Sequence, residues 1–196
     1  MATLLDDQAV IQRVLDHIDH QTTDLGDESW REPVANYLSP ERFAAELEVL
    51  RRYRVPFCPS AALAEPGSYL ARDAGGASIL AVRANDGVVR AFRNACRHRG
   101  MEVAEKSGCV KAFVCRYHGW TYGLDGKLRH VPHEHGFPGL DANTRGLSAL
   151  PTFERHGLVF VSQNPGAASD PSLESLPAVV PPSYKLRRTS EIEVAA

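Results

Sequence analysis

This sequence has no long hydrophobic run. Its uninterrupted apolar stretches stop at four residues, as at positions 79–82 and 158–161, whereas a membrane-spanning helix needs about 20. We therefore predict no membrane contact. The first residues, MATLLDDQ, are acidic and lack the layout of a signal peptide, which predicts a cytoplasmic protein.

An excess of charge of one sign is also missing. The 22 Lys and Arg residues nearly balance the 24 Asp and Glu residues, for a formal net charge of −2. Without a basic block or interleaved aromatic and basic residues, a nucleic-acid partner is not expected. No P-loop, dinucleotide fingerprint or hydrolase triad is recognisable. At 196 residues, the chain can bury one core and carry extensions.

Cysteine is scarce, with four residues in the chain. In a protein predicted to be cytoplasmic, they favour thiolate chemistry over disulfides. Cys96 and Cys115 belong to a paired motif. Cys58 and Cys109 are predicted to be ordinary buried or half-buried thiols.

The stretch from 96 to 122 contains two short pairs of soft metal ligands. Cys96 and His98 form the first pair, Cys115 and His118 form the second, and sixteen residues separate them. When two irons share bridging sulfides, the protein supplies only two ligands per iron. We therefore predict two ligand loops that hold one iron by two cysteines and the other by two histidines.

Glycines follow both pairs and support this interpretation. Gly100 and Gly119 allow tight reversals and a close approach of backbone N–H groups to cluster sulfurs. Trp120 and Tyr122 are predicted to shield one side from water.

The motifs C-x-H-R-G and C-x-Y-H-G-W together resemble the Rieske [2Fe–2S] domain, in the version found in Rieske non-haem iron oxygenases such as aromatic-ring-hydroxylating dioxygenase α subunits. The resemblance implies that Cys96 and Cys115 bind the inner iron and that His98 and His118 bind the outer one. Arg99 and Tyr117 complete the supporting residues. The implied fold is mainly β, a small antiparallel β sandwich with two cluster-binding loops, preceded by two N-terminal α-helices.

Rieske proteins of respiratory complexes differ from this sequence at three positions. They carry one further cysteine in each loop, joined as a disulfide, where this chain has Met101 and Tyr117. Their second loop also has a serine donor where this chain has Trp120. Fewer hydrogen bonds to the cluster predict a potential toward the low end of the range of about −150 to +300 mV.

The helices are expected in an N-terminal arm at residues 1–55. Residues 7–20 are expected to form an amphipathic helix, because its spacing would place five apolar side chains on one face: Val10, Ile11, Val14, Leu15 and Ile18. A second helix is expected to begin at Ser39-Pro40, with a capping hydroxyl and a proline in the first turn, and to run to about Tyr53. Its expected buried face is Phe43, Leu47 and Leu50, with a Glu48–Arg52 pair.

Short strands are expected in the Rieske domain at residues 56–165. They cover positions 68–72, a hairpin of 78–83 with 88–93 around Asn85-Asp86-Gly87, then 112–114, and a closing strand at 153–163. Between the last two, residues 122–131 are expected to turn back at Leu124-Asp125-Gly126-Lys127. His130, His133 and His135 suggest a second metal site. Pro132 and Gly136 interrupt any helix there, so we favour a solvated loop.

The last segment, 166–196, is predicted to be a linker followed by a strand-like start of a catalytic domain. In the resembled family, that domain carries mononuclear Fe(II) and the substrate pocket, and it is absent from this sequence. A truncation, a split gene product and a stand-alone protein all remain possible at this stage. Substrate, and whether this chain alone is an enzyme, are left open.

The leading hypothesis is the Rieske portion of a ring-hydroxylating oxygenase α subunit. It would pass electrons from a ferredoxin or flavin reductase to the mononuclear iron, within a trimer-type homo-oligomer when full length. One alternative is a stand-alone Rieske-type ferredoxin. Another is a structural Cys₂His₂ zinc module, whose usual ligand spacing fits poorly.

Overall fold

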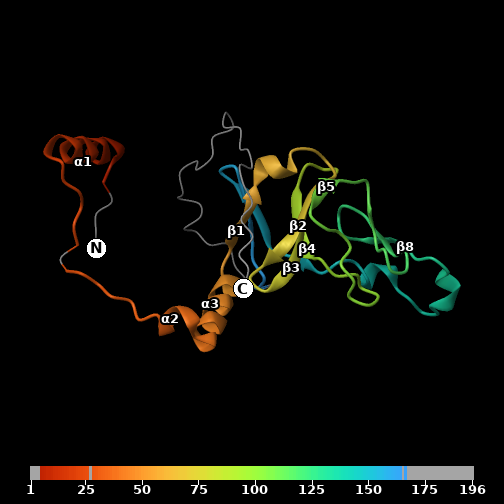
Figure 1. The fold of residues 1–196 in the computed structure, drawn as a ribbon. Coiled ribbons are helices and arrows are strands. Elements are labelled where there is room, and N and C mark those ends of the chain that lie inside the picture. The colour runs from red at the N-terminus through yellow and green to blue at the C-terminus, as the bar shows by residue number, and fades with distance from the viewer. Residues whose placement is uncertain (1–4, 27, 165, 167–196) are drawn as a thin grey trace. The chain divides into compact units, whose positions relative to one another are not determined.

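Two units make up the chain in this computed structural model, at residues 1–39 and 40–196. The structure describes residues 5–26, 28–164 and 166, so the predicted linker beyond 166 and the strand-like stretch at 183–196 lie outside the described residues. The first unit contains α1 (Asp7–His20) and α2 (Ala35–Leu38) (Figure 1). Within the described ranges, no helix combines the length and apolarity that a bilayer span requires.

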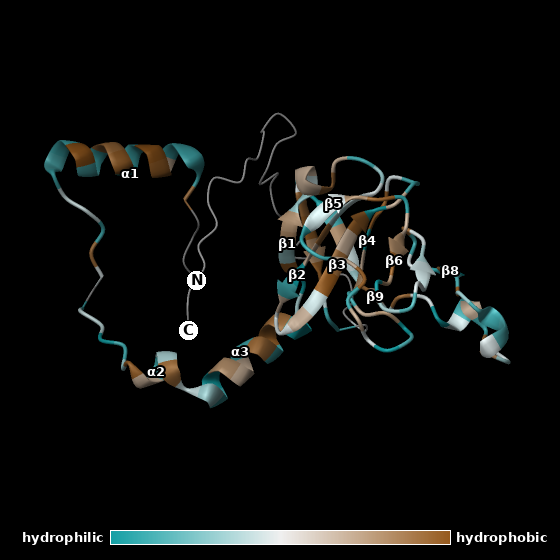
Figure 2. Ribbon diagram, turned by 45° about the vertical axis from the view of Figure 1, so that its right-hand side comes forward, coloured by the Kyte–Doolittle hydropathy of each residue, from teal (hydrophilic) through white to brown (hydrophobic). Residues whose placement is uncertain are grey.

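Helix α1 has the predicted range, and its ends explain why. The Asp6 carboxylate accepts a hydrogen bond from the Ala9 N–H at 2.8 Å, which caps the first turn. Gln21 adopts a left-handed conformation (φ 51°) and ends the helix. Apolar residues recur along the helix (Figure 2). All five side chains of the predicted apolar stripe are exposed.

Helix α3 (Pro40–Arg52) starts at the predicted proline, but its predicted buried face is wrong. Phe43 and Leu50 are exposed, and Leu47 is only half-buried. The helix instead contacts the sheet through Arg51, whose Nε donates to the Gly75 carbonyl at 2.9 Å. Glu48 forms its ion pair with Arg51, at 2.6 Å, rather than with the predicted partner Arg52.

The second unit is mainly antiparallel β, as predicted, and its strands form three sheets (Figure 1). A five-stranded sheet has the order β5 (Ser107–Cys109), β2 (Ser68–Ala74), β3 (Ala77–Arg83), β4 (Val89–Arg93), β9 (Ala149–Leu150). One three-stranded sheet is β1 (Val55–Pro59), β11 (Leu158–Val161), β10 (Thr152–Arg155). The other is β6 (Phe113–Val114), β7 (Thr121–Tyr122), β8 (Leu128–His130). Short 3₁₀ helices occupy Ser60–Leu63, Glu134–Gly136 (η2) and Ala142–Thr144.

Strand β3 separates two hydrophobic cores. Successive side chains of a strand point to opposite faces of a sheet. Ile79 and Ala81 therefore enter a core with β1 and β11, whereas Leu80 and Val82 enter a core with both ligand loops. All four are almost inaccessible to solvent. Full burial of such an aliphatic side chain contributes roughly 1.5–3 kcal/mol, so the platform beneath the loops is well anchored.

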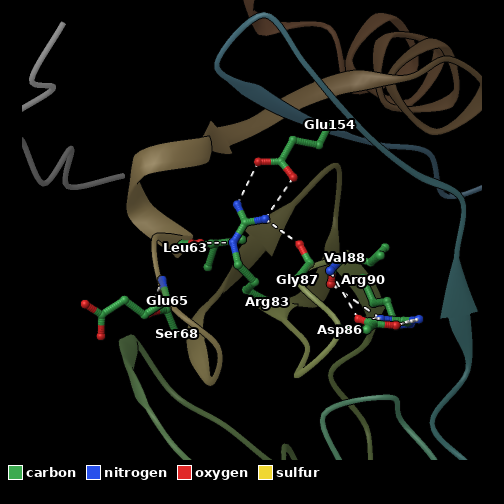
Figure 3. Close-up of polar contacts among 9 residues, drawn as sticks. All are labelled: Leu63, Glu65, Ser68, Arg83, Asp86, Gly87, Val88, Arg90 and Glu154. Carbon is green, nitrogen blue, oxygen red and sulfur yellow. Dashed lines mark hydrogen bonds and ion pairs between the residues drawn. The ribbon is translucent and has the colours of Figure 1, made fainter. Parts of the chain in front are cut away.

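The predicted β3–β4 hairpin is present, and it is tied to a second sheet. Gly87 takes φ 78° in the turn, where glycine has no steric penalty. The Arg83 guanidinium donates to the Gly87 carbonyl at 2.8 Å and forms two bonds with Glu154 of β10, at 2.7 and 3.0 Å (Figure 3). Arg83 thereby links the turn to the sheet of β1, β10 and β11.

Two further predictions need correction. The closing strand is divided into β10 and β11, because His156 and Gly157 both take positive φ and reverse the chain. Cys109 is exposed, because it lies on the edge strand β5. Cys58 is buried as expected, and burial raises its thiol pKa to about 11.

Candidate metal centre

The two predicted ligand loops close with the same turn. In loop 1 (residues 96–101), the Cys96 N–H donates to the Met101 carbonyl at 2.8 Å, and the Gly100 N–H donates to the Cys96 carbonyl at 2.9 Å. Loop 2 (residues 115–120) repeats both bonds, from Cys115 to Trp120 and from Gly119 to Cys115, at the same distances. Gly100 (φ 77°) and Gly119 (φ 71°) occupy the left-handed position that ends each turn.

The turns bring the four candidate ligands to one end of the domain. The Cys96 and Cys115 thiols are free and buried. The His98 and His118 rings lie 4.7 Å apart, centroid to centroid. Each histidine precedes its glycine, by two residues in loop 1 and by one in loop 2. The structure thus gathers two cysteines and two histidines as two pairs.

Burial affects the protonation of the cysteine and the histidine of loop 1 differently. Burial raises the pKa of the Cys96 thiol, the Tyr122 hydrogen bond opposes this, and the neighbouring Cys115 adds to the rise. Cys96 is therefore a protonated thiol that a metal must deprotonate. The pKa of His98 is lowered, first by burial and then by His118 and Arg99. A neutral imidazole is the form that binds iron.

One buried atom indicates where a ligand belongs. His98 Nδ1 is buried and has no hydrogen-bond partner in the described part of the protein. Buried nitrogen atoms nearly always have a partner, and a metal ligand atom is a ready explanation. The residues present therefore fit a [2Fe–2S] cluster held by two thiolates and two imidazoles.

Tyr122 does more than the predicted shielding. It is completely buried, and its hydroxyl oxygen accepts the Arg97 N–H at 2.9 Å and lies 3.2 Å from Cys96 Sγ. Because the oxygen already accepts from the amide, its proton is free to be donated to a Cys96 thiolate. Burial and the sulfur together raise the pKa of Tyr122, so the hydroxyl keeps that proton.

Aromatic rings surround the two histidines unequally. The Trp120 ring stacks on the His98 ring, with 5.0 Å between the centroids and 8° between the planes. The Phe137 ring packs edge-on against the His98 ring and the Trp120 ring, each at a centroid distance of 5.7 Å. His118 is exposed and has Tyr117 at 3.8 Å, with the Arg99 guanidinium 6.0 Å from the Tyr117 ring. Trp120 and Tyr122 are both buried, as predicted.

Sequence reasoning missed three neighbours of the loops. Phe137 closes over His98, Pro132 covers loop 2 so tightly that a Cβ on Gly119 would lie 2.8 Å from Pro132 Cγ, and buried Asn94 stands at the base of loop 1. The sequence contains no signal for Asn94, because its burial becomes known only from the fold. Pro132 lies in the stretch predicted to be a solvated loop, and Phe137 follows that stretch by two residues.

Among the described residues, the three histidines of that stretch are not gathered with other ligand side chains around one point. His130 ends β8, His135 lies in η2, and His133 takes a left-handed conformation (φ 53°) between them. All three are exposed, and the His133 and His135 rings are 5.9 Å apart.

A small antiparallel β domain with Cys–His pairs on two matched turns defines an iron–sulfur protein of the Rieske class. Comparison with known families agrees, because residues 53–154 match the Rieske [2Fe–2S] domain. The chain belongs to this family.

Similar proteins include large subunits of Rieske oxygenases. The large oxygenase component of the 2,4-dinitrotoluene dioxygenase system of Burkholderia sp. (strain RASC) is 41% identical over 48% of this chain and 22% of the relative. The carnitine monooxygenase oxygenase subunit of Escherichia coli (strain K12) is 33% identical over 72% of this chain and 38% of the relative. The chain thus spans well under half of these relatives.

Solved structures give the same result. The quaternary ammonium Rieske monooxygenase CntA, in complex with L-carnitine, has a TM-score of 0.67 at 31% identity, over 72% of this chain and 41% of that one. Naphthalene 1,2-dioxygenase from Rhodococcus sp., bound to indole, has a TM-score of 0.66 at 28% identity, over 85% and 38%. The predicted resemblance to Rieske oxygenases is therefore confirmed.

Proposed function

We propose that this chain binds one [2Fe–2S] cluster and transfers single electrons, with Cys96 and Cys115 as ligands of one iron and His98 and His118 as ligands of the other. The observation that carries the proposal is the pair of matched turns, which set two buried thiols and two adjacent imidazoles at one end of the domain. The bound cluster supplies reversible one-electron chemistry.

The surroundings of the histidines support a direction for electron exchange. Trp120 and Phe137 cover His98, whereas His118 is exposed. An exposed ligand can approach a partner protein closely, so His118 is the exchange point in this proposal. Tyr117 and Arg99 border it and provide a contact surface.

The larger context follows from the relatives. We propose that the chain acts as the Rieske portion of an oxygenase α subunit, in a trimer-type homo-oligomer, and passes electrons from a ferredoxin or flavin reductase to a mononuclear iron carried outside this sequence. The relatives' names include both nitroaromatic and carnitine oxygenases, so the ring-hydroxylating assignment and a cytoplasmic location stay predictions.

A structural zinc module is less well supported. One zinc ion needs four ligands around a single point. Among the described residues, no three His, Cys, Asp or Glu side chains are arranged around one such point. Two separate pairs suit two irons better.

Anaerobic reconstitution with iron and sulfide tests the proposal. We expect a brown protein whose reduced form gives the low-g EPR signal of a Rieske cluster. A colourless protein that binds one zinc per chain would contradict the proposal.

A further inference from the structure

The two ligand loops share a turn but differ at their bases. The ends of loop 2 run directly into β6 and β7, which pair Phe113 with Tyr122 and Val114 with Thr121. Loop 1 follows β4, whose neighbours are β3 and β9, and the next strand, β5, pairs with β2. Among the described strands, therefore, no ladder joins the two ends of loop 1.

The Asn94 side chain joins the two ends of loop 1 instead of a strand ladder. Its Oδ1 accepts the N–H groups of Val103 and Ala104, both at 3.1 Å, and its Nδ2 donates to the Ala104 carbonyl at 2.8 Å. A side-chain amide has one carbonyl and an NH₂ group. It satisfies residues 103–104 in the way that the peptide group of a neighbouring strand does.

Asn94 is also fixed to the platform below. Its backbone N–H donates to the Ser78 carbonyl at 3.0 Å, and Nδ2 donates to Ser78 Oγ at 3.1 Å. The Asn94 side chain is buried, as are Val103 and Ala104. Loss of these bonds is therefore unfavourable, because a buried polar group that is left without a partner is strongly destabilising.

The amide lies close to the ligands in the chain. Asn94 precedes Cys96 by two residues, and Val103 follows Met101, the hydrogen-bond partner of the Cys96 N–H, by two residues. The amide therefore sets the distance between the two ends of loop 1, the loop that contains both Cys96 and His98.

We propose that Asn94 is the positioning residue of loop 1: its amide replaces a strand ladder and fixes Cys96 and His98 for the cluster. This inference rests on the proposed cluster binding. Asn94 acts through the loop backbone, so its loss removes none of the four proposed ligand side chains and changes only how the loop holds Cys96 and His98.

The experiment compares Asn94→Ala with Ser162→Ala in the full chain. Asn94 and Ser162 are the two buried polar residues of the described part. Ser162 bonds to the Asn164 backbone after β11, away from both loops, so its variant reports ordinary loss of a buried hydrogen bond. Both variants and the unmodified chain are reconstituted, and an iron chelator is used to bleach the cluster.

We expect the Asn94→Ala cluster to bleach at least tenfold faster than that of the unmodified chain, with a shifted midpoint potential and shifted EPR g-values. Ser162→Ala should lower the melting temperature and leave all three cluster properties unchanged. Ser78→Ala removes one partner of the amide and should accelerate bleaching two- to threefold.

Each outcome is decisive. If Asn94→Ala holds its cluster as Ser162→Ala does, the inference is overturned. If Asn94→Ala does not fold, Ser78→Ala decides, and bleaching at the Ser162→Ala rate overturns the inference. An unmodified chain that shows no Rieske spectrum overturns the proposed function and, with it, this role of Asn94.

Discussion

Loop 1 and loop 2 have the same turn, but different parts of the fold pack around them. Loop 1 is closed at its base by a side chain, and its His98 is half-buried against Trp120 and Phe137. Loop 2 is closed by the β6–β7 ladder, and its His118 is exposed. Similar local sequence thus specifies similar turns, whereas the rest of the fold decides which histidine is half-buried and which is exposed.

The largest expected effect comes from removing a histidine. Either His98→Ala or His118→Ala should abolish the Rieske EPR signal, because each removes an imidazole ligand. Added imidazole should restore more of the signal in His118→Ala, where the replaced side chain is exposed, than in His98→Ala, where it is half-buried against Trp120 and Phe137. Equal rescue of both variants would show that the two sites are equally accessible.

Glycine substitution should separate the loops next. Gly100→Ala should lower the free energy of unfolding by the cost of the left-handed backbone alone, roughly 1–2 kcal/mol, because no atom lies within 4 Å of the added Cβ. Gly119→Ala has the same backbone cost, and its Cβ would also lie 2.8 Å from Pro132 Cγ. Urea unfolding should therefore show the larger loss of stability for Gly119→Ala. A larger loss in Gly100→Ala would argue against the tight contact at Pro132.

Tyr122→Phe should lower the midpoint potential and keep the cluster. The hydroxyl lies 3.2 Å from Cys96 Sγ, and a donor to a ligand thiolate favours the reduced, more negative state. Voltammetry of the reconstituted chain measures this shift. The low predicted potential depends on the absence of a serine donor at Trp120. The measurement also shows how far the Tyr122 hydroxyl compensates for that absence. An unchanged potential would mean that the hydroxyl does not donate to the sulfur.

The smallest effect is expected at the cysteines outside the loops. Cys109→Ser should leave the spectrum and the stability nearly unchanged, because the thiol is exposed on an edge strand. Cys58→Ser should keep the spectrum and lose some stability, because Cys58 is buried in the core that lies away from the loops. Loss of the Rieske signal in either variant would require a new assignment of the ligands.

The sequence by itself determined the features that depend on neighbours along the chain. The spacing of Cys96, His98, Cys115 and His118 was enough to name the candidate ligands, and Gly100 and Gly119 were enough to predict the turns, because a turn is decided within a few residues. Helix α1 and the β3–β4 hairpin followed from periodicity and turn chemistry in the same way.

Only the tertiary structure decided which side chains meet across the chain. Tyr122 contacts Cys96 across 26 positions of the chain, and Phe137 packs on His98 from a position 39 residues later, for which the sequence predicted no role. The exposed face of α3 and the exposed Cys109 were missed because burial depends on what packs against a residue. Asn94 is the clearest case, since its amide acts as a strand only after folding sets residues 103–104 beside it.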